Sequence, residues 1–182
     1  MYSLRIFVLL ATLFTAVSAV YDVRTSRIPN WLTALGMLVA VAAHTGLAYA
    51  TGALPFAMHA IGTTLLGAAV CALVPLLMWC AGLVGGGDVK LIAVVGALCH
   101  AAIGMEAVFL GLCLCSMFVV LKLAWEGDLL KSLFSAVRVL ANPILPAERK
   151  TEMVPSARQP VRFGPALAIG TILTALAHGV VA

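Results

Sequence analysis

The chain has 182 residues, of which 63% are hydrophobic and 10% are charged, and its mean hydropathy is +1.13. Soluble domains are about 45–50% apolar and about 25% charged, so this composition excludes a water-soluble globular domain and indicates a lipid environment. The net charge of +4 comes mostly from basic residues between apolar runs. In a membrane protein such residues are topology signals, and they do not indicate nucleic-acid binding.

Six apolar segments follow one another along the chain. Crossing a bilayer takes about 20 residues of helix, and helices are expected because lipid cannot satisfy free backbone groups. The fourth and fifth segments are separated only by Gly104 and Glu106. The predicted fold class is therefore all-α: one polytopic membrane domain, residues 1–182, with six transmembrane helices. These helices are predicted at residues 4–20, 32–50, 56–81, 90–104, 107–124 and 163–181.

The first segment has a second interpretation. Arg5, the apolar stretch after it and "AVSA" at residues 16–19 also resemble a signal peptide with its cleavage site. That interpretation would put Arg24 and Arg27 on the exported side of the membrane, against the positive-inside rule. We therefore prefer a membrane-spanning helix.

The basic residues predict the orientation of the helices. The connections at residues 21–31, 82–90 and 125–162 contain Lys or Arg, whereas those near 51–55 and 104–106 contain neither. With six crossings, the three basic connections lie on the same side of the membrane. By the positive-inside rule this side is the cytoplasm.

The loop at residues 125–162 has two parts. Residues 128–140 have apolar side chains on one helical face and polar ones on the other, which predicts an amphipathic helix on the cytoplasmic membrane surface or packed on protein. Residues 142–162 contain four prolines, which predict an extended linker.

Two of the seven acidic residues stand at predicted cytoplasmic helix ends. Asp22 ends the first segment and Asp88 begins the fourth, so both are expected on one side at one depth. Each could mark a helix end only, since the macrodipole favours an acid at a helix N-terminus. The preceding Gly85, Gly86 and Gly87 favour a functional interpretation, because glycine permits positive φ and the close approach of another backbone, such as a peptide substrate.

Two carboxylates at an apolar depth cannot both ionise easily, so such a pair shares one proton. This is the condition for aspartic proteolysis, in which one carboxylate activates water and the protonated partner polarises the scissile carbonyl. Lys90 either tunes the pair electrostatically or marks the cytoplasmic edge. The sequence has no histidine or cysteine spacing for a metal and no phosphate loop, so we expect no metal and no cofactor.

Three motifs resemble those of the prepilin peptidases, the type IV leader peptidase family of membrane aspartic proteases. "GGGDVK" at residues 85–90 resembles the G-x-G-D signature, and "YDVRTSRIPNWLT" at 21–33 resembles the motif with an Asp followed by I-P-N. "RFGPALAIG" at 162–170 resembles the F-G-P segment at the start of the last helix. The resemblance covers nearly the whole chain.

The resemblance implies that Asp22 and Asp88 are the catalytic pair. It also implies a prepilin or pseudopilin substrate, cut between its basic leader and its hydrophobic helix on the cytoplasmic side of the bacterial inner membrane, for pilus biogenesis or secretion. Pilus-assembly machinery and membrane lipids are further expected partners. The chain lacks the paired C-x-x-C zinc ligands of larger members, so it resembles the small type associated with Flp (Tad) pili. It has no recognisable S-adenosylmethionine site, so methyltransferase activity is not expected.

Other motif residues are expected to support the site. Pro29 and Asn30 are predicted to fix where the chain re-enters the membrane, and Gly164 and Pro165 do the same at the last helix. The basic residues of the loops are expected to contact anionic lipid, since they would repel a basic leader.

Two other functions are compatible with the sequence. In a small transporter, Asp22 and Asp88 would form an ion or proton site. In a non-catalytic pilus-assembly subunit, they would serve folding only. Transporters place their acids near the membrane midplane, whereas both aspartates are predicted at helix ends, which favours the peptidase.

Overall fold

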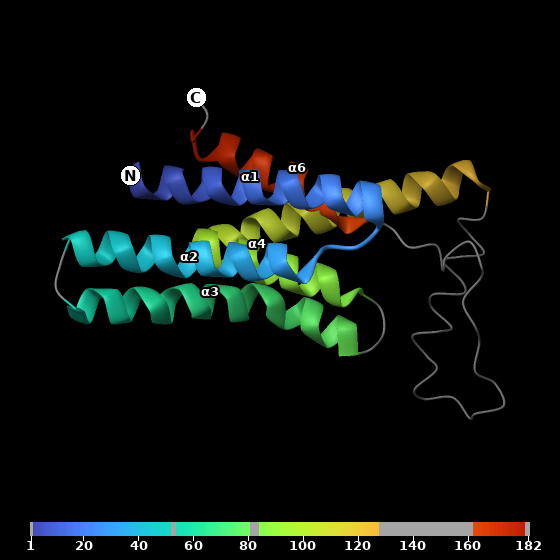
Figure 1. Ribbon diagram of the computed structural model, residues 1–182. Helices are drawn as coiled ribbons and strands as arrows, with labels where there is room; N and C mark the ends of the chain where they lie inside the picture. The colour runs from blue at the N-terminus through green and yellow to red at the C-terminus, as the bar shows by residue number, and fades with distance from the viewer. Residues whose placement is uncertain (1, 52–53, 81–83, 128–161, 181–182) are drawn as a thin grey trace. The chain divides into compact units, whose positions relative to one another are not determined.

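The structure, a computed structural model, describes residues 2–51, 54–80, 84–127 and 162–180, and within these ranges every regular element is a helix (Figure 1). The all-α prediction is therefore confirmed for this part of the chain. The helices are α1 (Tyr2–Thr25), α2 (Asn30–Thr51), α3 (Leu54–Cys80), α4 (Gly86–Trp125) and α6 (Phe163–Ala177).

Four of these helices, α1 to α4, are long and apolar enough to cross a membrane, and α6 is a shorter apolar helix of 15 residues. The protein is thus a membrane protein, while the number of six crossings stays a prediction. α1 continues beyond the predicted end at residue 20, because no glycine or proline interrupts it. It ends where Ser26 takes a φ of 52° and its N–H donates to Asp22 O at 2.9 Å.

The side chains are distributed as expected for lipid surroundings. Large apolar residues point outward, and Leu13 and Leu38 are 64% and 65% exposed. The buried positions of α1 and α2 include small residues such as Ala11 and Ala40. Small residues let membrane helices approach closely, and fully buried large side chains such as Leu91, Leu98 and Leu167 fill the space between the helices.

α4 reverses direction at His100, where φ is 59° and ψ is 173°. A Cβ built on Gly104 would lie 2.9 Å from Gly96 Cα, although eight residues of straight helix would separate these positions by about 12 Å. The two limbs of α4 therefore pack against each other. The sequence predicted a boundary between two segments at 104–106, whereas the helix bends at His100. The reversal comes earlier because residues 96 and 104 are both glycine, so the limbs meet there.

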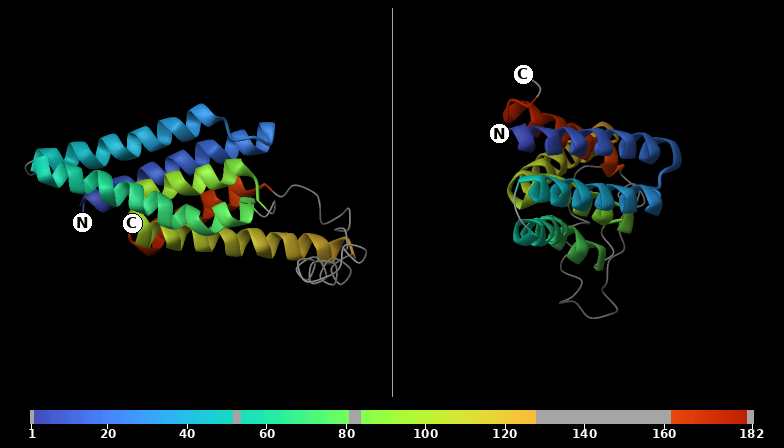
Figure 2. Two further views of the ribbon diagram at one scale, coloured as in Figure 1. Left: turned by 90° about the horizontal axis from the view of Figure 1, so that it is seen from below. Right: turned by 60° about the vertical axis from the view of Figure 1, so that its left-hand side comes forward.

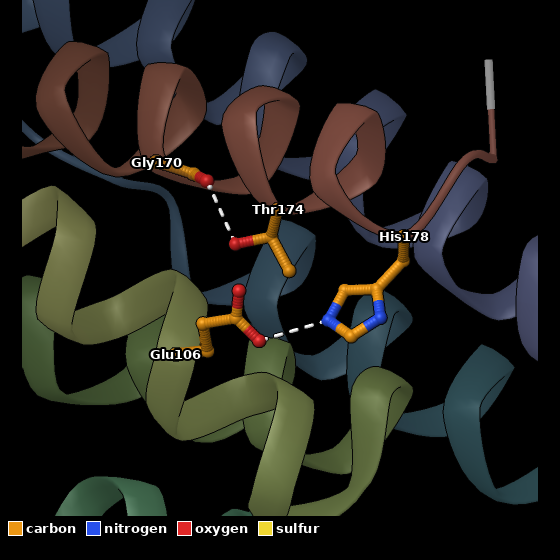
Figure 3. A network of polar contacts seen from close by, with 4 residues as sticks. All are labelled: Glu106, Gly170, Thr174 and His178. Carbon is orange, nitrogen blue, oxygen red and sulfur yellow. Dashed lines mark hydrogen bonds and ion pairs between the residues drawn. The ribbon is translucent and has the colours of Figure 1, made fainter. Parts of the chain in front are cut away.

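α6 lies beside α1, and α2 lies beside α3 (Figures 1 and 2). The buried hydroxyls of Thr15 in α1 and Thr171 in α6 are 2.8 Å apart. At the C-terminal end of α6, His178 Nε2 lies 2.8 Å from Glu106 Oε2 of α4 (Figure 3). α6 is thus fixed by polar contacts along its length.

The chain forms two compact units, one of Met1–Cys113 with Arg162–Ala182 and one of Leu114–Val161. In the second unit the described residues are the last part of α4 and the turn after it, where Lys122 Nζ is 3.9 Å from Glu126 Oε1. The amphipathic helix predicted at 128–140 lies outside the described residues, as does the linker predicted at 142–162 except for its last residue.

Candidate active site

Asp22 lies in the last turn of α1, and its side chain is buried. The N–H of Gly164, the second residue of α6, donates to Asp22 Oδ2 at 3.0 Å. A Cβ built on Gly164 would lie 2.9 Å from this oxygen, so glycine is what lets the start of α6 come so close. The N-terminus of a helix carries partial positive charge, and α6 therefore stabilises a negative charge on Asp22.

Asp88 lies in the first turn of α4 and is half-buried. Its N–H donates to Gly85 O at 3.1 Å, which begins the helix. The charge of Asp22 acts on Asp88, although the two residues come from different helices. Among the contacts of the described residues, no hydrogen bond joins their carboxyl groups.

The three glycines before Asp88 differ from the expectation. None has a positive φ, and the positive-φ glycines among the described residues lie elsewhere. The reason is that α4 begins at Gly86, so Gly86 and Gly87 already have helical backbones. A Cβ would meet Trp79 Nε1 at 3.2 Å from Gly86, and Ile28 Cβ at 3.7 Å from Gly87. Gly86 and Gly87 thus let the side chains of Trp79 and Ile28 come close to the start of α4.

Lys90 connects α4 to α2. Its Nζ donates to Asn30 Oδ1 at 2.8 Å, and both side chains are exposed. Asn30 begins α2, and Pro29 O accepts the N–H of Leu32 at 3.1 Å, which closes the first turn of that helix. Among the described residues, neither carboxylate of the candidate pair forms an ion pair with a cation. The partner seen for Lys90 is thus an amide and not Asp88.

A groove of about 300 Å³ lies between α2 and α4 beside this lysine. One end of the groove is polar, at Asn30 and Lys90, and most of the remaining lining is apolar. The groove reaches the first turn of α4, two residues from Asp88. It is lined by Asn30, Thr33, Ala34, Met37, Lys90, Ala93 and Val94.

The start of α6 combines three predicted features. Arg162 precedes the helix and makes no side-chain cap hydrogen bond. Pro165 is the third residue of the helix, where its missing N–H costs nothing. Gly164 contacts Asp22, so the residue predicted only to shape the chain also binds one of the two acids. The F-G-P motif could be recognised in the sequence, but no pattern indicated that its glycine binds Asp22.

The site residues thus come from segments far apart in the sequence. The end of α1, the start of α2 and the start of α4 are linked by the contacts of Ile28 with Gly87 and of Asn30 with Lys90, and α6 joins through Gly164. No curated protein and no solved structure matches the chain. Residues 8–120, well over half of the chain, match the type IV leader peptidase family. This match includes both aspartates and the connection between α1 and α2, and on it we conclude that the chain belongs to the type IV leader peptidase family and is a protease.

Proposed function

We propose that the chain is an aspartic endopeptidase whose catalytic pair is Asp22 and Asp88, and that it removes the leader from prepilin-like precursors. The observation that carries this proposal is the pairing itself. A buried Asp22 and a half-buried Asp88 come from different helices and interact electrostatically. Membership of a peptidase family calls for a group that activates water, and two neighbouring carboxyl groups supply it.

In the proposed mechanism, Asp22 is the general base. The hydrogen bond from Gly164 favours the negative charge on Asp22, so the proton shared by the pair resides on Asp88. Asp22 takes a proton from a water molecule, and the water oxygen attacks the scissile carbonyl carbon. Asp88 donates its proton to the carbonyl oxygen, which gives a tetrahedral intermediate with two hydroxyl groups. As the C–N bond breaks, Asp22 gives its proton to the leaving amine and Asp88 takes back a proton from a hydroxyl group, so the pair again shares one proton.

The surroundings of Asp88 suit an extended peptide. Gly85 is exposed and Gly86 and Gly87 are partly exposed, so a substrate backbone can approach the chain before Asp88. The groove between α2 and α4, which begins at Lys90, offers apolar walls for a substrate side chain. A prepilin-like precursor has a basic leader followed by a hydrophobic helix. In our proposal this helix lies in the bilayer along α2 and α4, and the leader extends into the cytoplasm.

Basic side chains at this end of the first unit support a cytoplasmic orientation. Arg24 and Arg27 follow Asp22, Lys90 follows Asp88, and Arg162 precedes α6; all four are exposed. By the positive-inside rule such an end faces the cytoplasm, in bacteria on the inner membrane. The Flp-type substrate, and partners among lipids and the pilus-assembly machinery, belong to the same proposal.

The positions of the acids favour a peptidase over a transporter. Asp22 is three residues from the end of α1, and Asp88 is the third residue of α4. An ion or proton site in a transporter is usually found near the membrane midplane. The positions of the acids do not distinguish a peptidase from a non-catalytic assembly subunit, so that alternative is tested by measuring cleavage.

The proposal is tested with the purified full chain in liposomes and a prepilin-like substrate. We expect Asp22→Asn and Asp88→Asn each to lower kcat/KM by about a thousandfold or more, as for loss of a general acid or base. The matched control is Glu106→Gln, which removes an acid that pairs with His178 at the other end of α6. It should cleave within about threefold of the wild type. Near wild-type cleavage by either aspartate variant would refute the assignment.

Orientation is tested separately, in a background from which the five cysteines have been removed. Arg24→Cys places a thiol at the candidate active-site end, and Tyr49→Cys places one near the end of α2, where the side chain is 67% exposed. A membrane-impermeant thiol reagent should label Arg24→Cys from the cytoplasmic side only. Labelling of that variant from outside the cell would overturn the orientation.

A further inference from the structure

A second, larger cavity of about 650 Å³ lies at the other end of the first unit, away from the aspartates. It is formed by the last turns of α2, the first turns of α3 and the bend of α4. Three of the four histidines of the chain line it, namely His44, His59 and His100. Polar rings are costly within apolar helices, and the proposed cleavage reaction uses none of the three.

His44 has a structural role. Its side chain is buried, its Nε2 lies 3.1 Å from Leu98 O, and its ring stacks on Phe7 with centroids 3.7 Å apart. His100 lies beside it, with the ring centroids 4.2 Å apart. His59 is exposed and His100 is partly exposed, so these two imidazoles are the ones open to a ligand.

The backbone of His100 points to a role for its side chain. The combination of φ 59° and ψ 173° belongs to a region that only glycine occupies without strain. Such strain is typical of functional sites. An imidazole is found where glycine would fit better, and it lines this cavity.

The rest of the cavity is apolar and opens toward the lipid-facing side of the helices. Phe56 and Leu66 line it and are 63% and 59% exposed, both on the candidate membrane span of α3. None of the described residues that line it is acidic. The cavity also begins within two turns of the ends of α2 and α3, which is the depth of lipid headgroups if these helices cross the bilayer.

We propose that this cavity binds one phospholipid with an anionic headgroup. His59 and His100 donate hydrogen bonds to its phosphate, and an acyl chain lies along Phe56 and Leu66. A hydrogen bond to a charged group is stronger than one between neutral groups, which favours the phosphate as the group bound. Because no described lining residue is acidic, a cationic headgroup such as choline would have no partner there, which favours an anionic headgroup. Because the ligand binds at the bend of α4, it braces the turn between the two limbs. The inference does not depend on the proposed catalytic pair.

The test uses the full chain, purified in mild detergent and stripped of lipid. Phosphatidylglycerol or phosphatidylcholine is added, and bound lipid is counted by native mass spectrometry. We expect one phosphatidylglycerol per chain, bound at least about tenfold more tightly than phosphatidylcholine. His59→Ala and His100→Gly should each weaken its binding by about tenfold or more, the loss of one charge-assisted hydrogen bond. The control is His178→Ala, outside the cavity, which should bind like the wild type.

His100→Gly separates binding from folding. Glycine relieves the backbone strain, so its melting temperature should equal or exceed that of the wild type while lipid binding falls. If this variant unfolds, the exposed His59 decides the test alone. Wild-type lipid binding by His59→Ala, or equal binding of the two lipids, would overturn the proposal. Displacement of the lipid by millimolar inorganic phosphate would also overturn it, since the site would then recognise a free anion.

Discussion

Replacing Gly164 with alanine is expected to slow cleavage about ten- to a hundredfold without unfolding the protein. The new Cβ would lie 2.9 Å from Asp22 Oδ2 and 3.0 Å from Asp22 Cβ. These contacts are too short, so the start of α6 or the Asp22 side chain must move by a few tenths of an ångström. The 3.0 Å hydrogen bond from Gly164 N–H to Asp22 then lengthens or breaks.

The magnitude follows from the strength of this bond. A hydrogen bond to a charged group contributes about 1.5–3 kcal/mol, and each 1.36 kcal/mol changes a rate about tenfold. Helix propensity acts in the opposite direction on stability, because alanine is up to about 1 kcal/mol better than glycine in a helix. The melting temperature should therefore change little while kcat/KM falls.

The assay is cleavage of a prepilin-like substrate by the purified variant, with kcat/KM as the readout. Without the Gly164 donor, the negative charge on Asp22 loses one stabilising hydrogen bond, so kcat/KM should fall. Gly62→Ala in α3 is the matched control, because a Cβ there has nothing within 4 Å. If Gly164→Ala kept the wild-type kcat/KM, the role of α6 in holding Asp22 would be refuted.

Three further substitutions test other contacts. Gly87→Ala should leave stability unchanged or higher, since its Cβ would make only ordinary contact at 3.7 Å. Cleavage should fall at least tenfold, because the substrate needs the space that the new methyl group occupies. An unchanged kcat/KM would contradict this. Lys90→Met should lower kcat/KM less than about tenfold, the value of one exposed hydrogen bond to Asn30, and a shifted pH profile would show instead that its charge acts on the aspartates. His44→Ala should cost about 2–3 kcal/mol of stability in detergent unfolding, because it leaves the buried Leu98 carbonyl without its partner; a loss below about 1 kcal/mol would contradict that contact.

The helices and the common end of the two aspartates could be predicted because both depend on local sequence and parity. Long apolar runs locate α1, α2 and α3 to within a few residues. Two helices that run in opposite directions bring the end of α1 and the start of α4 to one side. Neither feature depends on side-chain packing, so the sequence alone was enough to predict both.

The contacts that organise the site could not be predicted, because they depend on tertiary packing. The hydrogen bond between Gly164 and Asp22 joins residues 142 positions apart, and no pattern in either segment specifies the other. The bend of α4 falls at His100, where the sequence has neither glycine nor proline. The close packing that makes the bend possible is at Gly96 and Gly104, on either side of it.

The central claim is that Asp22 and Asp88 act as one catalytic unit. The most direct measurement is the single-turnover cleavage rate of Asp22→Asn, Asp88→Asn and the double variant, with substrate binding measured alongside. Residues that act as a unit are strongly non-additive. The account expects the double variant to be no slower than the slower single variant, with substrate binding retained in all three. Losses that multiply, or appreciable cleavage by either single variant, would contradict it.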